Sequence, residues 1–269
     1  MTHPAEIFRA LHVKGNPLLM INVWDRGSAR MMQGMGAKAL ATSSAAHAFT
    51  MGRPDGGTVS RDEALAHAAE IVSAVTIPVQ GDFENGFGDD PDTCAETVRL
   101  AAEVGLAGIC IEDTALPAQT AYDFELAVAR IKAAAAAARA LPDDFVLTAR
   151  ADGILTGAYD TDEAIRRLQA FDAAGADCLY APLPPDMAAL AKICAATTAP
   201  VNALVAGQFA GHSLADYAKI GVGRISLGSS LARITHRAIH DAAHEMLGAG
   251  TFDALQHGIS SDRIDALLA

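Results

Sequence analysis

The chain has 269 residues, of which 51% are hydrophobic, and a formal net charge of −12 at pH 7. This length can bury a large core, and the negative charge makes nucleic acid and anionic membrane surfaces poor partners. No run approaches the roughly 18 apolar residues of a membrane-spanning helix, and the N-terminal residues are polar rather than signal-like, so we expect a cytoplasmic protein.

Short apolar runs recur along the chain, and each has the length of a β-strand rather than of a helix. There are eight of them, at residues 18–24, 39–46, 77–84, 107–113, 145–152, 177–183, 200–205 and 224–228. Eight strands of this kind, if helices alternate with them, favour a closed barrel over a doubly wound sheet.

The segments between the apolar runs have the pattern of helices. Residues 60–75 begin with Ser60 and Glu63 in the spacing of a capping box, while 90–105 and 160–176 begin with acidic residues. The alternation therefore predicts one (β/α)8 barrel domain over the whole chain, 1–269, with an extra amphipathic helical stretch from about residue 251.

Polar side chains stand at the ends of three central strands. Asp82 and Glu84 share one face of the third run, because side chains alternate along a strand. Glu112 ends the fourth run and Arg150 the fifth. Active sites of such barrels lie at the carboxyl ends of the strands, so we expect these four side chains to meet in the barrel mouth.

Three carboxylates and one guanidinium in a confined space indicate a cation site. Crowded carboxylates repel each other, and a divalent cation such as Mg²⁺, which prefers oxygen ligands and retained waters, removes that cost. Arg150 would then hold a carboxylate or phosphonate by a bidentate contact. The simpler alternative is that Asp82 and Glu84 only solvate a strand end and accept hydrogen bonds from the following turn.

Serine residues follow two other strands. Ser43 and Ser44 end the second run, where they could bind a carboxylate or cap the next helix. Residues 228–233, GSSLAR, follow the eighth run and could form a phosphate-binding helix start or a plain serine cap. The residues alone leave both pairs of alternatives open.

Five short segments, in this order and spacing, resemble the isocitrate lyase/phosphoenolpyruvate mutase superfamily. They are NVWDRGSAR (22–30), ATSSAA with GRPD after it (41–55), GDFENGFG (81–88), GICIEDT (108–114) and TARAD (148–152). The resemblance implies a barrel enzyme dependent on Mg²⁺, or alternatively Mn²⁺, that acts on small 2-oxo or 2-hydroxy acids. The metal and an arginine would stabilise an enolpyruvate-like oxyanion while a C–C or P–C bond breaks.

The same resemblance implies a role for each matching residue. Asp82, Glu84 and Glu112 would surround the metal, mostly through water, with Asp55 near it. Ser43, Ser44 and Arg150 would hold the substrate carboxylate, and Asp25 and Asn202 are looser candidates for the substrate pocket. Such proteins usually form tetramers with an exchanged C-terminal helix, so we expect a homo-oligomer, a dimer or a tetramer, whose helices from about residue 251 are exchanged between subunits.

The segment after the fourth strand departs from the lyase branch of that superfamily. Residues 113–125 contain no cysteine, lysine or histidine, and Gln119, Thr120 and Tyr122 are the polar side chains that could take the place of the asparagine of the mutase branch. We therefore expect a lyase or decarboxylase other than a true isocitrate lyase, acting on a small carboxylate through an enolate. The alternatives are a phosphonate P–C enzyme and a non-catalytic 2-oxo acid binder.

Overall fold

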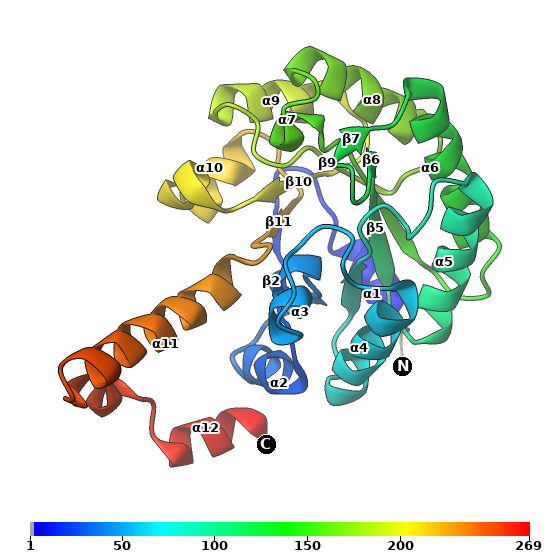
Figure 1. Ribbon diagram of the computed structural model, residues 1–269. Coiled ribbons are helices and arrows are strands. Elements are labelled where there is room, and N and C mark those ends of the chain that lie inside the picture. Colours follow the sequence, from blue (N-terminus) through cyan, green and yellow to red (C-terminus); the bar gives the residue numbers. More distant parts are fainter. Residues whose placement is uncertain (1–2) are drawn as a thin grey trace.

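A closed parallel barrel forms the centre of the computed structural model, which describes residues 3–269 (Figure 1). Its strands pair in the order β1-β11-β10-β9-β8-β5-β4-β3-β2. β1 and β2 are two parts of one strand interrupted at Met20; β1 pairs with β11 and β2 with β3, which closes the sheet. The strands are β1 (Leu18–Leu19), β2 (Ile21–Asn22), β3 (Leu40–Ala41), β4 (Val79–Asp82), β5 (Gly108–Glu112), β8 (Val146–Arg150), β9 (Cys178–Tyr180), β10 (Val201–Leu204) and β11 (Arg224–Ser226).

Helices surround the barrel, and the predicted (β/α)8 fold is confirmed. Ser60 and Glu63 form the predicted capping box, in which each side chain accepts a hydrogen bond from the other residue's backbone N–H. The helices from α1 to α10 are α1 (Pro4–Ala10), α2 (Arg26–Gly34), α3 (Ser44–Thr50), α4 (Arg61–Ala74), α5 (Pro91–Glu103), α6 (Phe124–Arg139), α7 (Gly153–Thr156), α8 (Thr161–Ala173), α9 (Met187–Ala196) and α10 (Leu214–Lys219), and a 3-10 turn, η1 (Gly207–Gly211), precedes α10.

The core lies between the strands and the helices. Ile109, Ile111 and Leu147 are fully buried there, as the alternation along their strands predicted. Each such side chain contributes about 1.5–3 kcal/mol by leaving water. The strands approach so closely that a Cβ on Gly108 would lie 2.3 Å from the Val146 carbonyl oxygen. Glycine is therefore required at the start of β5.

The C-terminal helices leave the barrel. α11 (Ser230–Gly248) projects outward in Figure 1, and η2 (Asp253–His257) and α12 (Ser261–Leu268) bring the chain back beside α2. Ala232 is the one fully buried residue of α11, whereas Leu247 is 89% exposed. Among residues 3–269, no helix combines the length and the apolarity needed to cross a membrane.

Candidate active site

A cavity of about 440 Å³ opens at the carboxyl ends of the barrel strands. It brings together seven of the nine residues that the sequence singled out. They come from β4 and the turn after it, from β5 and β8, and from the segments after β3, and they are Ser43, Ser44, Asp55, Asp82, Glu84, Glu112 and Arg150.

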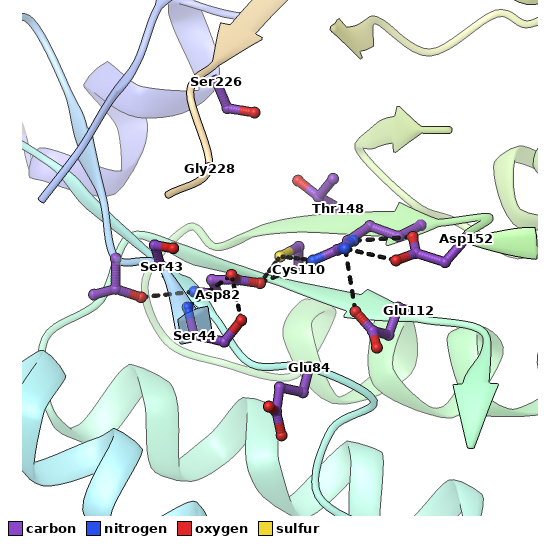
Figure 2. A network of polar contacts seen from close by, with 12 residues as sticks. Ser43, Ser44, Asp82, Glu84, Cys110, Glu112, Thr148, Asp152, Ser226 and Gly228 are labelled. Carbon is purple, nitrogen blue, oxygen red and sulfur yellow. Dashed lines mark hydrogen bonds and ion pairs between the residues drawn. The ribbon is translucent and has the colours of Figure 1, made fainter. Parts of the chain in front are cut away.

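Arg150 contacts three of the carboxylates that line this cavity. Its guanidinium binds Asp152 with two hydrogen bonds of 3.1 and 2.6 Å. It also lies 2.9 Å from Asp82 Oδ1 and 3.2 Å from Glu112 Oε2. Figure 2 labels these two carboxylates and that of Asp152. Burial alone would lower the pKa of Arg150, but the charges of these three carboxylates outweigh burial and keep its pKa well above the ordinary value. The guanidinium is therefore a permanent cation in a fixed orientation.

The carboxylates of the cavity carry more negative charge than Arg150 can balance. Burial is the main reason why the pKa of Glu112 lies well above its usual range, and the charges of Asp152 and Asp82 add to this effect. Burial and the nearby Asp82 also raise the pKa of Asp55, and burial raises the pKa of Glu84 to about 7. A bound cation would relieve this repulsion.

Loops and a helix start hold Asp82 and Glu84 in place. Ser44 donates to Asp82 Oδ2 from both its backbone nitrogen (2.9 Å) and its hydroxyl (3.0 Å). Glu84 takes a left-handed backbone conformation (φ 45°), and its Oε1 accepts from the Gly57 N–H at 3.0 Å. Neither carboxylate accepts from the glycine turn that follows, so both face the cavity instead of only solvating a strand end.

Two predicted substrate-binding residues do not line the cavity. Asp25 is the N-cap of α2, where its side chain accepts from the Ser28 N–H at 2.6 Å. Asn202 is completely buried inside the barrel and bonds Ser226 Oγ and the Arg224 Nε–H, each at 2.8 Å. Asp25 thus serves the start of a helix, and Asn202 could act on a ligand only through its two neighbours.

Several residues of the cavity escaped the sequence analysis. Asp152 makes the shortest contact with Arg150. Its position two residues after Arg150, in the TARAD segment, could have identified it as a partner of that arginine. Asn22 accepts from the N–H groups of Leu227 and Gly228, which ties β2 to the loop after β11. Asn22 is a polar residue at a strand end, so the rule that identified Asp82 could also have identified it.

A buried network of hydrogen bonds around Asp113 holds Asp152 in place. Asp113 Oδ1 accepts from the Asp152 N–H at 2.8 Å. Its other oxygen, Oδ2, accepts from the Tyr159 hydroxyl at 2.7 Å and from Arg167 Nη1 at 2.9 Å. The side chains of Asp113 and Arg167 are only 2% and 8% exposed. Asp113 therefore positions the residue that in turn positions Arg150.

The segment after β5 forms a small hairpin over the cavity. Its strands are β6 (Thr114–Ala115) and β7 (Thr120–Ala121), and Gln119 lines the cavity with a left-handed backbone conformation (φ 56°). A Cβ on Gly56 would lie 3.1 Å from Gln119 Nε2, so the two loops touch. The Thr114 hydroxyl is buried and has no hydrogen-bond partner among residues 3–269.

The donor chemistry fits a hard divalent cation bound partly through water. Carboxylate oxygens of Asp55, Glu84 and Glu112 face one cavity, and within residues 3–269 neither Asp55 nor Glu84 forms an ion pair, whereas Glu112 pairs with Arg150. Within residues 3–269, no three His, Cys, Asp or Glu side chains are arranged as a group that could by itself hold a metal ion. Water-mediated contacts, which Mg²⁺ commonly keeps, are compatible with that spacing.

Comparison with known proteins agrees with this fold. The sequence profile described as phosphoenolpyruvate phosphomutase matches residues 8–247. Relatives include an uncharacterized protein of Mycobacterium tuberculosis, 35% identical over 82% of this chain and 81% of that protein, and the 2-methylisocitrate lyase of Escherichia coli, 30% identical over 74% and 69%. The oxaloacetate decarboxylase of Ectopseudomonas mendocina is 29% identical over 91% of this chain and 85% of that protein.

Solved structures show the same relationship. A lyase/mutase candidate from Burkholderia cenocepacia J2315 has 45% sequence identity and a TM-score of 0.94, covering 99% of this chain and 95% of that one. An oxaloacetate acetylhydrolase has 26% identity and a TM-score of 0.85, covering 99% and 94%. The chain therefore belongs to the phosphoenolpyruvate phosphomutase family of the isocitrate lyase/phosphoenolpyruvate mutase superfamily.

Proposed function

We propose that this protein is an Mg²⁺-dependent lyase or decarboxylase that acts on a small 2-oxo or 2-hydroxy carboxylic acid through an enolpyruvate-like intermediate. One observation carries the proposal: Arg150, held by Asp152, shares one cavity with acidic side chains from two neighbouring strands. The lyase and the decarboxylase among its relatives support the same class of reaction.

Arg150 and the turn at Ser43 and Ser44 would hold the substrate carboxylate. Because the contacts with Asp152 fix the guanidinium before any ligand binds, its orientation costs little when the substrate arrives. The Ser44 hydroxyl and N–H donate to Asp82, whereas the Ser43 hydroxyl oxygen accepts from the Ala46 N–H and keeps its own proton free for a substrate carboxylate in the cavity. Negative charge that develops on the substrate would lie next to a fixed cation.

Asp82, Glu84, Glu112 and Asp55 would hold Mg²⁺, with Mn²⁺ as the alternative, directly or through water. When bound, such a cation polarises the keto oxygen of the substrate. Asp82 and Glu112 also contact Arg150, so a cation held by these carboxylates would share them with the guanidinium. The hairpin over the cavity, including Gln119, would limit the access of water to the substrate.

The hairpin contains none of the side chains that would make an obvious general acid. Residues 113–125 lack cysteine, lysine and histidine. Cleavage in which an enolate leaves needs no proton at the moment of bond breaking, and the enolate can then take its proton from water, so this reaction suits the site. We therefore propose a reaction different from that of a true isocitrate lyase.

A panel of 2-oxo and 2-hydroxy acids, assayed with and without Mg²⁺, tests the proposal. Arg150→Ala should lower kcat/KM at least about 100-fold because it removes the cation that stabilises developing negative charge, and Glu112→Gln should do the same because it weakens the proposed cation site. The matched control is Glu96→Gln, since Glu96 pairs with Arg99 on the outer face of α5. Full turnover in Glu112→Gln or Arg150→Ala protein would overturn the proposal, and tight binding without turnover of any acid would indicate a non-catalytic binder.

Phosphonate chemistry is the second candidate. The matching family profile is described as a phosphomutase, and Gln119 reaches the cavity from the hairpin, where it could meet a phosphoryl group. Phosphorus NMR after incubation with phosphonopyruvate tests it directly. An unchanged spectrum with active protein removes this candidate.

We also infer that subunits associate through the C-terminal helices. Ile234 and Ile239 on α11 are 65% and 66% exposed, and Phe252 and Leu255 beyond it are exposed as well. Apolar surface of this extent usually marks an interface. Light scattering should therefore show a dimer or tetramer, and a truncation after residue 229 should give monomers if these helices carry the contact.

A further inference from the structure

A second buried arginine lies at the floor of the cavity. Arg224 begins β11, and only 1% of its surface is exposed. It lines the same cavity as Arg150 but reaches across the barrel interior to residues of β4 and β8. The proposed function gives this guanidinium no role.

The hydrogen-bond partners of Arg224 are all neutral. Its Nη1 donates to Gln80 Oε1 at 2.6 Å and to Thr148 Oγ1 at 3.0 Å, and its Nε donates to Asn202 Oδ1 at 2.8 Å. The His12 ring also lies 3.1 Å from Nη1. Burial, reinforced by Arg224 itself, lowers the pKa of His12 to about 3, so that ring is neutral as well.

The charge of Arg224 is therefore unbalanced. Arg150 and Arg167, which are also buried, both contact carboxylates, whereas Arg224 has no carboxylate within 4.0 Å among residues 3–269. Within the same described range its Nη2 makes no hydrogen bond at all. Buried charges are normally paired, because an unpaired one loses its hydration without compensation.

A comparison with Arg130 shows why the position of Arg224 matters. Arg130 is equally buried and also donates to neutral backbone oxygens. It lies outside the cavity, however, and its guanidinium is stacked on the Tyr122 ring at 4.1 Å. Arg224 is the buried arginine with neutral partners that a ligand in the cavity can approach.

A second donor stands beside Arg224. The Ser226 hydroxyl oxygen accepts from Asn202 Nδ2 at 2.8 Å, which leaves its own proton free to be donated. Ser226 lines the cavity, and its side chain is labelled in Figure 2. Asn202 therefore orients both donors: its oxygen holds the guanidinium of Arg224 and its nitrogen holds the hydroxyl of Ser226. Two preorganised donors of this kind match an anionic oxygen.

We propose that Arg224 and Ser226 form a second anion-binding subsite on the cavity floor, positioned by Asn202, so that the preferred substrate carries two anionic groups. This inference rests on the proposed function, in which Arg150 and the Ser43–Ser44 turn hold the first carboxylate. The second group would point down the barrel axis. A carboxylate and a phosphonate share the chemistry that this subsite recognises.

The subsite also bears on which bond breaks. A guanidinium stabilises a carboxylate as an anion, so a group held by Arg224 would lose CO₂ less readily. Arg224 therefore favours a substrate whose second anionic group stays on one of the products. Cleavage of a C–C bond between the two anchored ends satisfies this condition, whereas loss of the anchored carboxylate does not.

Calorimetric binding of two matched acids in the presence of Mg²⁺ tests the subsite. Lactate and malate are both 2-hydroxy acids, and malate adds the second carboxylate. We expect the unaltered protein to bind malate about 10- to 100-fold more tightly than lactate, the range of a charge-assisted contact. Pyruvate and phosphonopyruvate form a second pair, which shows whether a phosphonate is accepted in place of the carboxylate.

Variants assign this preference to individual residues. Arg224→Gln should abolish the preference for malate and change lactate binding less than about 3-fold, Arg224→Lys should keep most of it, and Ser226→Ala should reduce it about 3- to 10-fold. Arg139→Gln removes the same charge at the end of α6, outside the cavity, and should leave the preference unchanged.

The outcomes separate the subsite from the proposed function. Equal binding of lactate and malate by the unaltered protein, or an intact preference in folded Arg224→Gln protein, overturns the subsite alone. Binding of neither acid overturns the proposed function and the subsite together. If Arg224→Gln does not fold, an unchanged preference for malate in Ser226→Ala protein overturns the subsite, and a reduced one supports it.

Discussion

Replacing Asp113 with asparagine should both destabilise the fold and impair the site. Three donors converge on the two oxygens of Asp113: the Asp152 N–H, the Tyr159 hydroxyl and Arg167 Nη1. Asparagine offers only one acceptor oxygen, so at least one donor would face an NH₂ group. The buried contact with Arg167 would also lose its charge.

The expected cost follows from the depth of this network. Removing one partner of a buried ion pair typically costs about 3–5 kcal/mol. Arg167 keeps its contacts with Glu163 at 2.8 Å and with the Tyr122 carbonyl at 2.9 Å, so it is not left entirely without partners. We therefore expect the lower end of that range, about 3 kcal/mol.

Urea unfolding of the variant and of a matched control measures this cost. Glu163→Gln removes the other carboxylate that contacts Arg167, but that side chain is 25% exposed and should contribute less than about 1 kcal/mol. In the folded fraction of the Asp113→Asn protein, kcat should fall about tenfold or more, because Asp152 no longer holds Arg150 in place.

Two results would refute this reasoning. The first is a loss of stability in Asp113→Asn protein no larger than in Glu163→Gln protein, since burial is the reason for expecting a difference. The second is an unchanged kcat in stable Asp113→Asn protein, which would mean that Asp113 does not position the active-site arginine.

Three further predictions concern pH, packing and a helix cap. The fold raises the pKa of Glu84 from 4.5 to about 7, so metal-free protein should lose about 2 kcal/mol of stability from this group as pH rises from about 5 to about 7. Glu84→Gln should abolish this loss, and a Glu84→Gln protein that loses as much stability between pH 5 and pH 8 as the parent in urea unfolding would contradict the prediction. Gly108→Ala would place a Cβ 2.3 Å from the Val146 carbonyl oxygen, so it should lower the free energy of unfolding by about 3 kcal/mol or prevent folding. A melting temperature within a degree of the parent would mean that β5 and β8 can move apart to make room for the methyl group. Ser60→Ala removes the cap of α4 and should cost about 1 kcal/mol in chemical denaturation; no change would mean that Glu63 maintains the helix start without it.

The architecture could be predicted from the sequence because its signals are local. The eight apolar runs alternate with helical segments, and all eight became barrel strands. The capping box at Ser60 and Glu63 depends on residues three apart in the chain. Strand-end positions identified Asp82, Glu84, Glu112 and Arg150, because in a parallel barrel every strand delivers its last residues to the same edge.

Only the tertiary structure decided how side chains from different strands pair. Asp25 and Asp152 are both acids that follow a strand, yet Asp25 caps a helix while Asp152 holds Arg150. Nothing in the segment RISLG indicates that Arg224 meets Gln80, which lies 144 residues away, on the floor of the cavity. Hydrophobic period and helix caps act within a few residues of the chain, whereas the partner of a buried charge depends on barrel closure and on the direction of each side chain, which no local pattern records.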